Sequence, residues 1–186
     1  MSVTAKQSMQ VFNRADRLYN QQQVEDVIQS MALEITEHMA EKNPLVLCVM
    51  TGGLILTGQL LLHLNFPLQL DYVHATRYGN LTQGNELEWV AKPKHSLKDR
   101  VVLVIDDILD EGLTLASILA YCENCQAKEV YSAVLINKSH ERKQGIANAD
   151  FIGLSVPDRY VFGYGMDYKG YLRNAKGIYA AQKNDE

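Results

Sequence analysis

Three aspartates that directly follow an apolar run are the residues of this chain best suited to chemistry. The run Val101–Ile105 is rich in valine and isoleucine, which predicts a strand buried on both faces of a parallel sheet. Asp106, Asp107 and Asp110 follow it, and a helical pattern begins after Gly112. Ligands of open α/β sheets bind at the carboxyl ends of the strands. We therefore expect these carboxylates to face a ligand.

The loop that opens the following helix is predicted to bind an anion. Backbone N–H groups and the helix dipole concentrate positive charge there. The carboxylates of Asp106 and Asp107 suit two vicinal hydroxyls, directly or around Mg²⁺, so a sugar phosphate would satisfy both parts. The alternative is an acidic, solvated turn in which Asp110 only caps the helix. The loop consists of Asp110, Glu111, Gly112, Leu113 and Thr114.

This acidic segment resembles the ribose-phosphate motif of the type I phosphoribosyltransferases: an apolar strand, two acids, two apolar residues, an aspartate and a loop with glycine and threonine. Further segments resemble the hypoxanthine-guanine phosphoribosyltransferases, in order and spacing, over roughly residues 45 to 175. The acidic motif indicates the superfamily, whereas the C-terminal segment points to 6-oxopurines. The further matching segments are Met50–Gly53, Arg77–Tyr78, Lys138, Pro157–Tyr168 and Arg173.

The resemblance implies an α/β fold, the type I phosphoribosyltransferase fold, with a central, mostly parallel sheet flanked by helices and a small hood built from the terminal segments. We expect one domain over residues 1–186, with the core at about 24–155 and the hood from the N-terminal residues and about 156–186.

Apolar periodicity predicts alternating strands and helices, which favours a parallel sheet. The polar stretch 76–86 predicts a long mobile loop. The expected strands are 45–49, 68–74, 87–91, 101–105, 130–136 and 151–154, and the expected helices are 24–39, 54–64 and one that begins near Leu113.

The activity implied by the resemblance is Mg²⁺-dependent transfer of the phosphoribosyl group from phosphoribosyl pyrophosphate to hypoxanthine or guanine, a purine-salvage step that yields IMP or GMP and pyrophosphate. Asp110 would take the proton from purine N7 as general base. Asp106 and Asp107 would hold the ribose hydroxyls, and the loop at 110–114 would bind the phosphate. Positioning and electrostatics would stabilise the positive charge that develops on the ribose.

Pyrophosphate binding is implied for two loops and one C-terminal arginine. Paired glycines after the strand at 45–49 let backbone amides approach a ligand, and the resemblance places a strained non-proline peptide at Met50–Thr51. Arg77-Tyr78 would close over the pyrophosphate as part of a lid. The alternatives on the residues alone are a tight turn without ligand and an ordinary hairpin connection. The implied set is Thr51, Gly52, Gly53, Arg77, Tyr78 and Arg173.

The purine is expected to bind between a lysine and an aromatic segment. Lys138 could donate to a 6-oxo group but would meet a donor on adenine. Tyr160 could stack on the base, and the resemblance implies that the Val161 main chain reads the purine edge. The alternatives are a solvated lysine and a plain core tyrosine. The resemblance also places Asp167 among the purine-binding residues, and the Mg²⁺ ligands that it implies are Asp106, Asp107 and Asp167.

Three positions depart from the family pattern. Thr51 stands where family members often carry lysine, which removes a charge contact to phosphate but leaves the amides. Glu111 replaces a hydroxyl residue, and Leu113 replaces a polar or basic one. A glutamate that points inward would repel phosphate. We therefore expect Glu111 to face solvent, while the loop amides and the Thr114 hydroxyl bind the phosphate.

Charge and hydropathy argue against a nucleic-acid-binding, membrane-spanning or exported protein. A net charge of -4 argues against a nucleic-acid surface. No apolar run approaches the ~20 residues that span a bilayer, and no export segment is recognised, so a cytoplasmic protein without a membrane partner is expected. Cys122 and Cys125 match C-x-x-C but fall at the end of a helix, which indicates a structural role.

Two rival functions stay open, as does the oligomeric state, for which a homodimer or homotetramer is expected. One rival is a xanthine-preferring phosphoribosyltransferase on the same scaffold, since Lys138 disfavours only adenine. The other is a fold-related nucleotide-sensing regulator of transcription, against which the net charge and the lack of an obvious basic helix argue.

Overall fold

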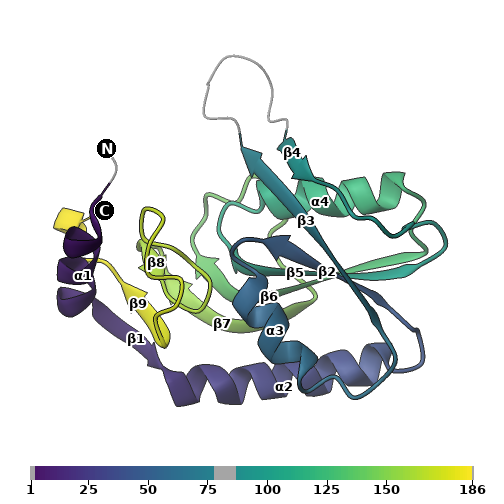
Figure 1. The fold of residues 1–186 in the computed structure, drawn as a ribbon, viewed down its shortest axis with the longest axis horizontal. Coiled ribbons are helices and arrows are strands. Elements are labelled where there is room, and N and C mark those ends of the chain that lie inside the picture. Colours follow the sequence, from purple (N-terminus) through teal and green to yellow (C-terminus); the bar gives the residue numbers. More distant parts are fainter. Residues whose placement is uncertain (1–2, 78–86, 186) are drawn as a thin grey trace.

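The computed structural model describes residues 3–77 and 87–185, and its centre is a six-stranded sheet (Figure 1). The strand order is β4-β3-β2-β5-β6-β7. All neighbours are parallel except the β3–β4 pair at one edge, so the expected mostly parallel sheet is confirmed. The strands are β2 (Leu45–Met50), β3 (Gln69–Arg77), β4 (Leu87–Ala91), β5 (Val101–Leu109), β6 (Glu129–Ser139) and β7 (Phe151–Pro157).

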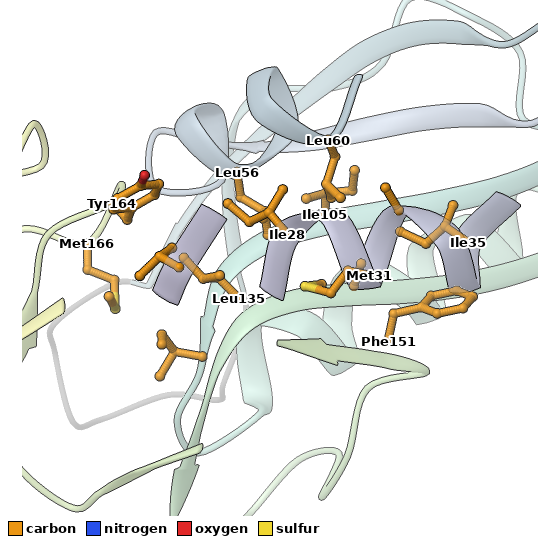
Figure 2. Close-up of a cluster of buried hydrophobic side chains, with 14 of the residues drawn as sticks. Ile28, Met31, Ile35, Leu56, Leu60, Ile105, Leu135, Phe151, Tyr164 and Met166 are labelled. Atoms are coloured by element: carbon orange, nitrogen blue, oxygen red, sulfur yellow. The ribbon is translucent and has the colours of Figure 1, made fainter. Parts of the chain in front are cut away.

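Helices cover both faces of this sheet, which explains the continuous apolar run in β5. Leu103 and Ile105 pack in the cluster formed with α2 (Gln21–Met39) and α3 (Leu54–Leu61), where Ile28, Met31 and Ile35 of α2 lie beside β-strand side chains (Figure 2). Val102 and Val104 pack on the other face with α4 (Leu113–Asn124). No helix in the described part of the chain is long and apolar enough to cross a membrane.

A second, three-stranded sheet in the order β1-β9-β8 forms the expected hood from segments near both ends of the chain. Its strands are β1 (Asp16–Asn20), β8 (Val161–Phe162) and β9 (Gly177–Ala180). Helix α1 (Ala5–Arg14) precedes β1, and a short 3-10 helix, Lys183–Asp185, follows β9. Arg14 forms an ion pair with Asp185, which ties α1 to that last turn.

Several strands run further than the apolar pattern predicts. Strand β5 was expected to end at Ile105, but it continues through both aspartates to Leu109, because β6 supplies ladder partners for Asp106, Ile108 and Leu109. Strand β3 likewise continues past the expected end at residue 74 to Arg77, paired with β4. Conversely, α3 ends at Leu61, three residues before the predicted boundary. Nearly all of the loop predicted at 76–86 lies outside the described residues.

Candidate active site

The two adjacent aspartates lie inside the carboxyl end of β5 and are almost buried. Asp106 and Asp107 are each 8% exposed, and the backbone N–H of Asp107 donates to Asp106 Oδ1 at 2.9 Å. Burial raises the pKa of Asp106 well above its ordinary value, and the neighbouring Asp107 raises it further. Burial also raises the pKa of Asp107, against the lowering effect of Arg173. Two buried carboxylates side by side favour a bound cation or hydroxyl donors.

The expected pyrophosphate loop packs directly against these acids. The Met50–Thr51 peptide bond is cis, at the position where a strained non-proline peptide is expected. A Cβ on Gly52 would lie 1.9 Å from Asp107 Oδ2, and a Cβ on Gly53 would lie 2.6 Å from the Ile105 carbonyl oxygen. Both glycines are therefore required by the close approach of this loop to β5.

Arg173 links the acidic strand to the C-terminal segment. Its guanidinium lies 3.9 Å from Asp107 Oδ2 and 2.6 Å from Asp167 Oδ1. It also donates to the Gly165 carbonyl oxygen at 2.6 Å. This cation partly compensates the charge of Asp107 and contacts Asp167 at the same time.

The phosphate loop is held by a segment that the sequence did not single out, residues 140–146, which we call the strap. The backbone N–H groups of Gln144 and Gly145 both donate to the Glu111 carbonyl oxygen at 3.0 Å, and Lys143 Nζ donates to the Leu109 carbonyl oxygen at 2.9 Å. Gly112, the N-cap of α4, has φ +80°, and a Cβ there would lie 2.2 Å from the Ile146 carbonyl oxygen. The strap therefore fixes the conformation of the phosphate loop through its contacts with the loop backbone.

A cleft of about 450 Å³ opens in front of this loop, lined by residues 106–112 with Thr114 and Leu115. The Glu111 side chain was expected to face solvent, but only 30% of it is exposed. Its carboxylate lies 3.7 Å from an Arg142 guanidinium nitrogen in the strap. A basic partner beside Glu111 offsets the repulsion that the sequence suggested between this side chain and a phosphate.

Asp110 has a cationic and an imidazole partner. Lys138 Nζ donates to Asp110 Oδ2 at 2.8 Å, and His140 Nε2 lies 2.7 Å from Asp110 Oδ1. Burial acts to raise the pKa of Asp110, but the hydrogen bonds from Lys138 and His140 outweigh it and hold this pKa below its ordinary value. Asp110 is therefore an ionised carboxylate at neutral pH.

Asp110, His140 and Asp158 are, in the part of the chain that the structure describes, a group of three side chains with ligand atoms within 4.8 Å of one another. The ammonium of Lys138 lies 2.8 Å from Asp110 Oδ2 and 3.8 Å from Asp158 Oδ1. The positive charge among these carboxylates is thus already supplied by a lysine, which argues against a metal ion at this place.

A second pocket, of about 230 Å³, adjoins the first and shares three of its residues, Asp107, Ile108 and Asp110. The Tyr160 hydroxyl accepts a hydrogen bond from the Lys169 backbone N–H at 3.2 Å, and its ring meets Tyr168 edge-on at 5.4 Å. Lys138, Tyr160, Val161, Met166 and Asp167 complete the lining, so the residues predicted to contact a purine come together.

Comparison with known proteins matches residues 14–169 to the phosphoribosyl transferase domain family. The hypoxanthine-guanine-xanthine phosphoribosyltransferase of Tritrichomonas foetus is 34% identical over 163 residues, which cover 84% of this chain and 86% of that protein. The chain belongs to the hypoxanthine-guanine phosphoribosyltransferase family. The enzyme of that family from Bacillus subtilis is 32% identical over 158 residues, covering 84% of this chain and 87% of the relative.

Solved structures of the family agree in fold. A hypoxanthine-guanine-xanthine phosphoribosyltransferase superposes with a TM-score of 0.80 at 30% identity, covering 91% of this chain and 95% of the other. The Trypanosoma cruzi hypoxanthine phosphoribosyltransferase, solved in complex with the product IMP, superposes with a TM-score of 0.84 at 25% identity, covering 92% and 95%. The type I phosphoribosyltransferase fold is thereby confirmed.

Two residues expected in the pyrophosphate site lie at the edge of the described residues or beyond it. Arg77 is the last residue of β3, and Tyr78 lies outside the described residues. The resemblance also did not point to the polar residues of the strap, His140 above all. Their only signal in the sequence is a cluster of basic side chains immediately after Lys138. Cys122 is a buried free thiol whose pKa burial raises to about 12, which fits the structural role expected.

Proposed function

We propose that this protein transfers the phosphoribosyl group of phosphoribosyl pyrophosphate to hypoxanthine or guanine and releases pyrophosphate. The observation that carries the proposal is the pair of adjoining pockets that share Asp107, Ile108 and Asp110. A 5′-phosphate on the loop amides and a purine beside Lys138 would place the ribose C1 at this shared wall, where the new C–N bond forms and the bond to pyrophosphate breaks.

Asp106 and Asp107 are proposed to bind the ribose hydroxyls and to hold Mg²⁺ together with the substrate. Burial raises the pKa of both carboxylates, and a divalent cation would supply the positive charge that favours their ionised form. Bound Mg²⁺ would neutralise charge on the departing pyrophosphate. Arg173 and the Gly52 amide would bind the pyrophosphate oxygens, with Thr51 contributing no charge. Gly53 would serve only the close approach of the loop, because its N–H donates to the Val49 carbonyl oxygen at 2.9 Å.

Asp110 is proposed as the general base at purine N7, and Lys138 as the donor to the 6-oxo group. An ammonium has three N–H donors, so Lys138 can keep its contact to Asp110 Oδ2 while it donates to the purine. Adenine would present its own donor to this ammonium and is therefore rejected. Tyr160 would stack on the base, and the Val161 main chain would meet its edge.

Xanthine is the second candidate substrate, because the name of the Tritrichomonas foetus relative includes it. A homodimer or homotetramer is proposed for the assembly. Exposed apolar side chains on α3, at its end and on β3 suit a subunit contact, and light scattering would measure the mass. They are Leu54, Leu62, Leu70 and Tyr72.

The test measures transfer to hypoxanthine, guanine, xanthine and adenine with saturating phosphoribosyl pyrophosphate and Mg²⁺. The Asp110→Asn variant, measured beside the parent, tests the general base. We expect transfer to the 6-oxopurines, and turnover lowered by roughly 10²–10⁴-fold in Asp110→Asn, with IMP binding kept. Transfer to adenine alone, or to none of the four bases, would refute the proposed function. Turnover within a few-fold of the parent in Asp110→Asn would refute only the assignment of the general base.

A further inference from the structure

His140 lies at the start of the strap, one residue beyond β6, and it contacts the proposed general base. Its side chain is 5% exposed, and its Nε2 lies 2.7 Å from Asp110 Oδ1. The other carboxylate oxygen, Oδ2, receives Lys138. Each oxygen of Asp110 therefore has its own partner, and the two partners come from the same end of β6.

The second ring nitrogen of His140 fixes the tautomer. The backbone N–H of Arg142 donates to His140 Nδ1 at 3.0 Å, so Nδ1 is an acceptor and carries no proton. The proton of the neutral imidazole is then on Nε2, which donates to Asp110 Oδ1. Arg142 is itself held in place, because its guanidinium contacts both carboxylate oxygens of Asp158 at 2.7 Å.

We propose that His140 is a positioning residue for the transfer reaction: its Nε2–H keeps the Asp110 carboxylate aimed at the purine while Lys138 also donates to the 6-oxo group. The proposal rests on the proposed function and deepens it. Without His140, the carboxylate would have only Lys138 as a partner and would follow that side chain when a base binds. With His140, Oδ1 stays fixed, and Oδ2 can take the N7 proton on the lone pair that Lys138 does not use.

The tautomer also excludes the rival role of metal ligand for His140. A metal needs a ring nitrogen with a free lone pair, but Nε2 carries the proton and Nδ1 accepts from Arg142. The same contact has a consequence for titration: burial acts to raise the pKa of Asp110, whereas the hydrogen bonds from Lys138 and His140 lower it.

Two substitutions separate the contacts of His140. In His140→Gln, the side-chain Nε2 sits as many bonds from the backbone as the histidine Nε2, so a donor to Asp110 is kept. In His140→Asn, the shorter amide can accept from the Arg142 N–H but cannot reach Asp110. The distant control is His63→Asn, at an exposed residue beyond α3.

We expect kcat to fall by about ten- to a hundredfold in His140→Asn, the range for a lost hydrogen bond to a charged group. The KM for phosphoribosyl pyrophosphate should change by less than about threefold, because the loop amides bind the phosphate. His140→Gln and His63→Asn should behave like the parent. The acidic limb of kcat should move to higher pH only in His140→Asn, because the lost donor lets the pKa of Asp110 rise.

Carboxyl carbon NMR of ligand-free protein, with Asp110→Asn to assign the signal, provides a readout that is independent of activity. The pKa of Asp110 should rise in His140→Asn and stay in place in His140→Gln. An unchanged pKa, or equal loss of kcat in the Asn and Gln variants, would overturn the proposal. A parent inactive with all four bases would instead refute the proposed function, and the NMR titration would still decide whether His140 holds Asp110.

Discussion

Gly145→Ala offers a sharp test of the strap, because the obstacle at this residue is backbone rather than a movable side chain. A Cβ at Gly145 would lie 2.3 Å from both the carbonyl carbon and the carbonyl oxygen of Gly112, and 2.6 Å from the Leu113 nitrogen. Ordinary contact begins near 3.4 Å, so the strap must withdraw by roughly 1 Å. Such a shift would break the two 3.0 Å hydrogen bonds from Gln144 and Gly145 to Glu111.

The lost bonds set the expected magnitude. The Ile146 N–H also donates to the Gly112 carbonyl oxygen, at 3.4 Å, and this longer bond would be lost with the other two. At about 1 kcal/mol for each of the two to three bonds, the loss in the free energy of unfolding is about 2–3 kcal/mol. For a chain of this size, that is a fall in Tm of roughly 4–12 °C. The KM for phosphoribosyl pyrophosphate should rise as well, because the loop amides lose the support that aims them at the phosphate.

Urea denaturation and initial rates at varied phosphoribosyl pyrophosphate would measure both effects. Gly58→Ala is the matched control, since a Cβ there meets nothing within 4 Å and the residue lies in α3. That variant should gain about 0.5–1 kcal/mol from helix propensity and keep its KM. If Gly145→Ala matches the parent in stability and KM, then the strap does not hold the phosphate loop in the way inferred.

Three further substitutions probe other contacts. Lys138→Gln should weaken hypoxanthine and guanine binding and reduce the penalty on adenine, as competition assays would show; an unchanged ranking of bases would exclude Lys138 from reading the 6-position. Glu111→Ser should change the KM for phosphoribosyl pyrophosphate only modestly, because Arg142 already lies 3.7 Å from the carboxylate. If the substitution instead tightened IMP binding strongly, and if this gain became smaller at high salt, Glu111 would be shown to repel phosphate. Asp71→Asn should lower stability at neutral pH. Burial acts to raise the pKa of Asp71, but the hydrogen bonds from Tyr72, Lys94 and His95 outweigh it and lower this pKa, so the folded state favours the ionised carboxylate. That contribution is present above the ordinary aspartate pKa and is lost as the pH falls through the lowered value, so urea titrations of parent and variant should converge in acid.

Strand β5, which carries the aspartates, could be predicted because burial on both faces requires a continuous run of apolar residues. Val102 and Val104 face one helix layer while Leu103 and Ile105 face the other, so every position of the run must be apolar. The end of the strand could not be predicted in the same way. Residues 106–109 are extended because of their pairing with β6, and that partner lies some distance along the chain.

The strap and the strands of the hood could not be predicted from local sequence patterns, for a related reason. The strap has no regular periodicity, and its conformation comes from hydrogen bonds to Glu111 and Gly112 across the fold. Strand β1 is mostly polar and is defined by its pairing with β9. Capping boxes at Thr4 and Asn20 mark the starts of α1 and α2, but the predicted helices did not use them: no helix was expected at α1, and α2 was expected to begin only at residue 24.

The pairing order in the hood has a consequence for biosynthesis. Val161 of β8 pairs with Ala180 of β9, and Ala180 pairs in turn with Asp16 of β1. During translation, the six-stranded sheet has all of its strands once Pro157 has left the ribosome. Strand β1, made early, has no partner until β9 emerges. The nascent chain would therefore carry a folded sheet with the acidic strand and the phosphate loop in place, and the wall against the purine would be added last.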